Sequence, residues 1–236
     1  MANVPSLSRC SPQAVACAIG NVEHEAHAIS SLIDTLSRQG KLAAAQEYLT
    51  HLDLLIADTS LSLRAHISLL NASGLYAMAI GDLSQAQRAF QSAFVHDTLG
   101  QHPRTVLTRR WIGICLYRQG ALDEAKNWLQ STLSLAIERG WERDAEYLRI
   151  VLAAIDLDTG NIDSAAERIA QSYAWARRYA EREHVAQAAY QYARLHTLRG
   201  DLPAARASLA EAIDLFERLG MRRELAEARQ ALADLA

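Results

Sequence analysis

Residues that can face a core recur along this chain at helical spacing. They occupy positions i, i+3, i+4 and i+7, as in Leu129, Thr132, Leu133, Ala136 and Ile137, and this period places them on one face of a helix. No window keeps the strict alternation of period two that a half-buried strand requires. The pattern therefore predicts an all-α protein with about eleven helices of roughly 15–19 residues each.

The predicted helices form an internal repeat of about 40 residues. A Gly followed two residues later by Leu or Ile and five residues later by Ala occurs five times, as GKLAAA, GDLSQA, GALDEA, GNIDSA and GDLPAA. These turn glycines are Gly40, Gly81, Gly120, Gly160 and Gly200. A second series of stops lies halfway between them, at Gly20, Ser60, Gly100, Gly140, Ala180 and Gly220. Because Gly accepts a left-handed conformation just past a helix end, each repeat is predicted to be a helix A, a turn and a helix B.

Small and large residues recur at fixed places around the turn glycines. Small residues lie seven positions before the turn, at Gly74, Gly113, Ala153 and Ala193, whereas the first repeat has Ile33 there. Alanines lie five positions after it, at Ala45, Ala86, Ala125, Ala165 and Ala205. Large apolar residues lie nine positions after it, at Leu49, Phe90, Leu129, Ile169 and Leu209. We expect the small residues to let helices A and B approach closely and the large ones to fill the space between them.

In these positions the chain resembles the tetratricopeptide repeat (TPR) family over roughly residues 21–236. The resemblance implies a right-handed solenoid of antiparallel helix pairs, a TPR-like superhelix. The usual repeat of that family has 34 residues, and the Pro that usually closes its helix B is absent here. Longer repeats of this kind resemble the sensor domain of MalT-like bacterial transcriptional activators. We accordingly expect an N-terminal segment with a short helix over 1–20, five helix-pair repeats over 21–220 and a capping helix over 221–236.

Composition and charge narrow the expected surroundings of the protein. The net charge of −3 argues against a chain-wide basic surface for nucleic acid. Cys10, Cys17 and Cys115 do not form a disulfide framework and suit a reducing cytoplasm. No stretch approaches the ~20 apolar residues of a membrane span, and the N-terminus lacks the basic start of a secretory signal. We predict a cytoplasmic protein.

The sequence contains no recognisable catalytic motif. It has no phosphate loop, no GxGxxG and no GxSxG. His24, Glu25 and His27 form HEAH, which lacks the HExxH spacing of zinc proteases. We interpret two pairs of acidic residues, Asp123 with Glu124 and Asp156 with Asp158, as charges at helix N-termini and on solvated faces. The chain is therefore predicted to be non-enzymatic, with no catalytic residue, no metal and no cofactor.

The resemblance also implies where a ligand would bind. In TPR arrays the A helices line the concave face, and the ligand-facing positions lie thirteen, ten, six, three and two residues before the turn glycine. In the fourth repeat this register includes Asp158. From the register we select as candidates Asn71, Met78, Arg110, Ile114, Tyr117, Arg118, Tyr147, Ile150, Gln187, Tyr190 and Arg194. Three Tyr and three Arg are among them, and these residue types are enriched at binding hot spots. The alternative is that the longer repeat shifts the register, so that some of these residues face a neighbouring helix.

Several functions are compatible with such a scaffold. We favour a non-catalytic interaction scaffold, a regulatory or signal-sensing module that binds a protein or peptide segment, or a small anionic effector, in its concave groove. The second hypothesis is a small-molecule effector sensor domain of a transcriptional regulator, or an enzyme that uses the same groove. A third is structural assembly through the convex face. We expect neither direct nucleic acid binding nor membrane binding, and the oligomeric state is left open.

Overall fold

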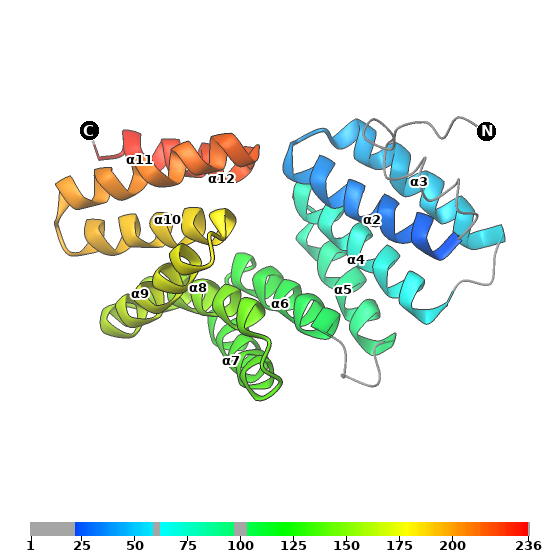
Figure 1. Ribbon diagram of the computed structural model, residues 1–236, viewed down its shortest axis with the longest axis horizontal. Helices are drawn as coiled ribbons and strands as arrows, with labels where there is room; N and C mark the ends of the chain where they lie inside the picture. The colour runs from blue at the N-terminus through cyan, green and yellow to red at the C-terminus, as the bar shows by residue number, and fades with distance from the viewer. Residues whose placement is uncertain (1–21, 59–61, 97–102, 236) are drawn as a thin grey trace, which may run out of the picture. The chain divides into compact units, whose positions relative to one another are not determined.

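The protein is described by a computed structural model over residues 22–58, 62–96 and 103–235. Eleven α-helices occupy these residues, and no strand occurs among them (Figure 1). The predicted short helix within residues 1–20, Cys10, Cys17, and the stops at 20, 60 and 100 lie outside the described residues. The helices are α2 (Val22–Arg38), α3 (Leu42–Asp58), α4 (Leu63–Ile80), α5 (Leu83–His96), α6 (Pro103–Arg118), α7 (Leu122–Glu138), α8 (Glu142–Asp158), α9 (Ile162–Arg178), α10 (Arg182–Leu198), α11 (Leu202–Leu219) and α12 (Arg222–Ala233). Helices α5 and α12, with 14 and 12 residues, are shorter than predicted.

The chain forms two compact units, residues 1–100 and 101–236, called unit 1 and unit 2 below. In unit 1, α2 packs against α3 and α4, and α4 packs against α5. In unit 2, each helix packs against the next from α6 to α12, and α8 also contacts α6 and α10. The even-numbered helices are therefore the predicted A helices and the odd-numbered ones the B helices. Among the A helices, α4 lies beside α2, and α8 lies beside α6 and α10.

The turns between helices have the predicted left-handed backbone. Positive φ angles occur at Gly40, Gly81, Gly120, Gly140, Gly160, Gly200 and Gly220. Ala180, at one of the two stops that are not glycine, also has a positive φ of 54°. This conformation costs an L-residue about 1 kcal/mol or more, and the turn is closed by the hydrogen bond from the Glu181 N–H to the Ala176 carbonyl oxygen at 2.9 Å.

The small and large residues meet as predicted. A Cβ added at Gly74 would lie only 2.6 Å from the ring of Phe90, and one added at Gly113 would overlap the side chain of Leu129. Ala153 and Ile169 belong to one buried cluster between α8 and α9. The five helix-B alanines that follow the turn glycines are fully buried. The close A–B contact therefore depends on the absence of side-chain volume on helix A opposite a large residue on helix B.

Helix α12 packs against α11 through its apolar face. Ala228 is fully buried, and Leu225, Leu232 and Leu235 pack against a cluster that includes Leu209 and Phe216. This contact has the form of a helix A that lies against the preceding helix B.

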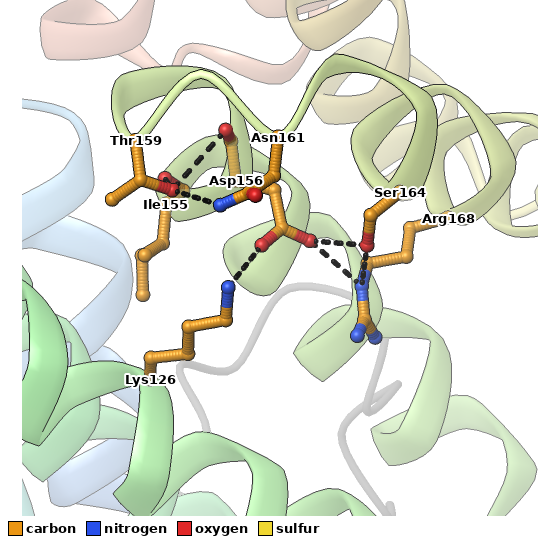
Figure 2. A network of polar contacts seen from close by, with 7 residues as sticks. All are labelled: Lys126, Ile155, Asp156, Thr159, Asn161, Ser164 and Arg168. Carbon is orange, nitrogen blue, oxygen red and sulfur yellow. Dashed lines mark hydrogen bonds and ion pairs between the residues drawn. The ribbon is translucent and has the colours of Figure 1, made fainter.

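A buried carboxylate links the third and fourth repeats in unit 2 (Figure 2). Asp156 of α8 accepts hydrogen bonds from Lys126 Nζ of α7 at 2.7 Å, Ser164 Oγ of α9 at 2.8 Å and Arg168 Nε of α9 at 3.0 Å. Its side chain is only 1% exposed. Burial disfavours the charged form, but Lys126, Ser164 and Arg168 outweigh this effect and lower the pKa of Asp156. The interpretation of Asp156 as a solvated charge near a helix N-terminus is wrong, because this residue lies in the last turn of α8 against two B helices.

Candidate functional site

Three A helices of unit 2 meet at a polar network that contains two of the selected residues. Tyr117 of α6 donates a hydrogen bond from its hydroxyl to Asp158 Oδ2 of α8 at 2.6 Å. Arg194 of α10 forms an ion pair with Asp158 Oδ1 through Nη2. Arg194 Nη1 also donates to Gln191 Oε1 at 3.0 Å. The network places a phenol, a carboxylate and a guanidinium from three successive repeats within direct contact of one another.

The electrostatics of this network keep the Tyr117 phenol protonated and the Arg194 guanidinium charged at neutral pH. Burial raises the pKa of Tyr117 to about 12, helped by its hydrogen bond to Asp158, so the phenol stays protonated. Burial disfavours the cation of Arg194, but Tyr117 and Asp158 outweigh this effect and raise its pKa. The side chains of Arg194 and Asp158 are 26% and 33% exposed, respectively. The network is thus charged, hydrogen-bonded and open to solvent in part.

A second group of side chains lies nearer the N-terminal ends of the same A helices. The Arg110 guanidinium lies 4.3 Å from the centre of the Tyr147 ring and 5.3 Å from that of Trp111. The Tyr147 ring in turn lies 3.4 Å from the ring of His184 on α10. Arg110 is only 6% exposed. The structure therefore brings the predicted Arg110 and Tyr147 together as a stacked pair, in which Tyr147 is half-buried and Arg110 is covered.

His184 is a buried member of this second group. Its ring is fully buried, and Nε2 lies 3.4 Å from the carbonyl oxygen of Arg143. Burial lowers the pKa of His184 to about 4, so the ring is neutral at pH 7. It supports Tyr147 as an uncharged aromatic neighbour.

Arg118 and Tyr190 lie within electrostatic reach of α12. Burial lowers the pKa of Arg118, Arg223 lowers it further, and Glu227 and Glu224 oppose the shift. Burial also raises the pKa of Tyr190, with Glu227 as the next cause. Charged side chains of α12 therefore influence the half-buried Arg118 and Tyr190. We call the surface that Tyr117, Arg118, Asp158, Tyr190 and Arg194 form on α6, α8 and α10 the A-helix surface of unit 2.

The remaining selected residues are distributed unevenly. Ile114 and Gln187 are half-buried on α6 and α10, whereas Ile150 on α8 is buried. Asn71 and Met78 are both buried on α4 in unit 1. The structure therefore groups Tyr117 with Arg194 and Arg110 with Tyr147, and it places Asn71 and Met78 in the other unit.

Three participants were missed by the selection from sequence. Asp158 stood in the predicted register but was not selected, because an acidic residue near a helix end suggests only solvation. Gln191 and His184 stand outside the register, nine and sixteen residues before Gly200. The sequence around His184 does not distinguish a buried histidine from an exposed one.

The HEAH segment does not form a recognisable metal centre. His27 Nδ1 lies 2.8 Å from Ser68 Oγ of α4, and Glu25 lies 3.6 Å from His51 Nε2 of α3. Among the described residues, no group of three or more His, Cys, Asp or Glu side chains is arranged to hold a metal ion. A search of the same residues finds no helix with the length and apolarity needed to cross a membrane.

Comparisons with known proteins identify the fold. Neither a protein-family model nor a curated protein sequence matches the chain. Among solved structures, the Rap conjugation gene regulator of the plasmid pLS20, in complex with the Phr* peptide, matches with a TM-score of 0.72 at 13% identity, over 97% of this chain and 62% of that one. A Rap protein complexed with competence and sporulation factor matches with a TM-score of 0.64 at 14% identity, over 90% and 64%.

A third similar structure is a signal transduction ATPase with numerous domains from Pyrococcus horikoshii, which has a tetratricopeptide repeat sensor. It matches with a TM-score of 0.60 at 15% identity, over 91% of this chain and 37% of that one. The chain spans less than two thirds of the length of each of these three proteins. At such identities the likeness establishes the fold alone. The protein is an all-α protein built from TPR-like helix pairs, as the repeat pattern predicted.

Proposed function

We propose that this protein is a non-catalytic regulatory scaffold that binds a peptide segment on the A-helix surface of unit 2. The observation that carries the proposal is the network of Tyr117, Asp158 and Arg194, which joins three successive A helices and remains partly exposed. Tyr and Arg side chains on neighbouring helices provide the apolar area and the directed hydrogen bonds that peptide recognition requires.

The similar structures support the same class of ligand. Two of the Rap proteins that share this fold are complexes, one with the Phr* peptide and one with competence and sporulation factor. In this proposal, Tyr117, Tyr190 and Arg194 contact the peptide. The buried Arg110 does not contact it, but holds the Tyr147 ring in place by stacking on it. The expected cytoplasmic location and the absence of catalysis are parts of this proposal.

The long repeats of this chain also resemble the sensor domain of MalT-like activators. The tetratricopeptide sensor in the Pyrococcus horikoshii ATPase shares the fold at a TM-score of 0.60. This likeness supports a second candidate function, in which the same surface senses a small effector for a transcriptional regulator.

A retention experiment tests the peptide-binding function. The purified chain is equilibrated with a pool of random pentapeptides that have acetylated and amidated ends, and retained peptides are measured by ultrafiltration and mass spectrometry. We expect a subset to be retained, and we expect Arg194→Gln to weaken its binding by about tenfold, as for the loss of a charge-assisted hydrogen bond.

Arg218→Gln is the matched control. Arg218 pairs with Asp214 at 2.9 Å on α11, on a helix B, and its side chain is far more exposed than that of Arg194. The control should retain the same peptides as the wild type. If no pentapeptide is retained by the wild-type chain, peptide binding is wrong. If both variants lose binding equally, the A-helix surface is not the site.

A further inference from the structure

Asp158 is held by two donors that together form a receptor for a carboxylate. The Tyr117 hydroxyl approaches one carboxylate oxygen from α6, and the Arg194 guanidinium approaches the other from α10. A phenol and a guanidinium aimed at the two oxygens of one carboxylate provide directional, charge-assisted recognition. In this structure the carboxylate comes from the protein itself.

The three members of the network are not equally fixed. Tyr117 and Arg194 are half-buried, and Arg194 keeps a second hydrogen bond to Gln191 at 3.0 Å. Asp158 is exposed and is the last residue of α8. A negative charge at this end of a helix is unfavourable, because the C-terminal end of the helix dipole is itself negative. The acceptor is therefore the member that can leave, while both donors stay in place.

Asp156 shows the contrast on the same helix. Its carboxylate is buried and accepts hydrogen bonds from Lys126, Ser164 and Arg168. Moving this buried carboxylate away from its partners would leave its own charge without compensation. Asp158 can rotate into water, because a third of its side chain is already exposed.

We infer that Asp158 is an internal substitute for an acidic side chain of a bound peptide, which exchanges with it on Tyr117 and Arg194. The inference rests on the proposed peptide-binding function and adds the ligand class, a peptide that carries Asp or Glu. When a peptide carboxylate replaces Asp158, the hydrogen bond from Tyr117 and the ion pair with Arg194 are both formed again. The replacement therefore costs little free energy. A neutral amide cannot form the same ion pair and is disfavoured.

Two defined peptide pools test the exchange. Both consist of pentapeptides with capped ends and random flanking residues other than Asp and Glu; one has Asp at the centre and the other has Asn. The wild-type chain should prefer the Asp pool. Asp158→Asn removes the competing charge, so it should retain the Asp pool about tenfold more strongly if Asp158 occupies the donors nine tenths of the time.

Two further variants complete the test. Arg194→Gln should abolish the preference for the Asp pool. Asp214→Asn, which opens an exposed ion pair on α11, should leave the preference unchanged. Equal or weaker retention of the Asp pool by Asp158→Asn would overturn the inference and make Asp158 a fixed support for Arg194. Retention of neither pool by any variant would overturn peptide binding itself, and this inference with it.

Discussion

Asp156 and Asp158 lie two residues apart at the end of α8, yet their surroundings are opposite. Asp156 faces the B helices α7 and α9, is buried and is held by Lys126, Ser164 and Arg168 (Figure 2). Asp158 faces the A helices α6 and α10 and is exposed. Residues i and i+2 of a helix point to different sides. The difference shows that a buried carboxylate connects α8 to the neighbouring B helices, whereas a partly exposed one connects it to the neighbouring A helices.

The largest expected effect comes from removing the buried carboxylate. Asp156→Ala should lower the free energy of unfolding by about 1–3 kcal/mol, because Lys126, Ser164 and Arg168 lose the buried acceptor that they share. Asp158→Ala should cost less than about 1 kcal/mol, as expected for a partly exposed ion pair.

Urea unfolding at pH 7 measures both changes. The four tryptophans, Trp111, Trp128, Trp141 and Trp175, all lie in unit 2, so their fluorescence reports on the unit that contains both carboxylates. Equal destabilisation by the two variants would show that the contrast between the two sides of α8 is wrong.

A double-mutant cycle sharpens the comparison. Arg168→Met combined with Asp156→Ala should show a coupling free energy of about 1–2 kcal/mol, because the two side chains are in direct contact. The cycle of Arg194→Met with Asp158→Ala should give a coupling below about 1 kcal/mol. A larger coupling free energy for Asp158 and Arg194 would mean that this ion pair also stabilises the fold.

Acidification should weaken the buried network selectively. The pKa of Asp156 is lowered in the folded chain from its ordinary value of 3.8. Its contribution to stability is therefore fully present above pH 3.8 and is lost as the pH falls through the lower, folded pKa. The stability advantage of the wild type over Asp156→Asn should be constant between about pH 5 and 7 and should shrink below about pH 4. An advantage that grows on acidification would contradict the assigned direction of the shift.

The smallest expected effect concerns one hydroxyl. Ser164→Ala should cost about 0.5–1.5 kcal/mol, because Asp156 loses its neutral donor while keeping both cations. Ser134→Ala is the control, since the exposed Ser134 hydroxyl donates only to the backbone of Gln130 one turn earlier. The control should change stability by less than about 0.5 kcal/mol in the same fluorescence measurement. A loss as large at Ser134 as at Ser164 would show that the hydroxyl at Asp156 has no special role.

The sequence predicted the helices and their pairing well, because both depend on local and periodic features. Turn glycines mark the helix ends, and small residues such as Gly74 and Gly113 specify where Phe90 and Leu129 pack. The buried network at Asp156 could not be predicted, since it requires Lys126 to reach from α7 across 30 residues of sequence. An acidic residue in a polar stretch gives no sign of such burial.

The candidate site was predicted only in part. The register placed Tyr117 and Arg194 on neighbouring A helices, but their meeting point, Asp158, depends on side-chain reach between repeats. The register also placed Arg110 at a ligand-facing position, whereas its side chain is buried and stacks on the rings of Trp111 and Tyr147. Spacing alone specifies a helix face, and the side chains of the next helix decide which residues on that face remain open.

The fit of each large residue into its small partner limits how this chain could be recombined. Phe90 needs the bare backbone of Gly74, whereas Ile169 packs beside the methyl group of Ala153. A chimera that joined α5 to α8 would bring a phenyl ring against a methyl group where only a hydrogen fits. Functional hybrids of these repeats should therefore exchange each A helix together with its own B helix, with crossovers in the turn that follows helix B.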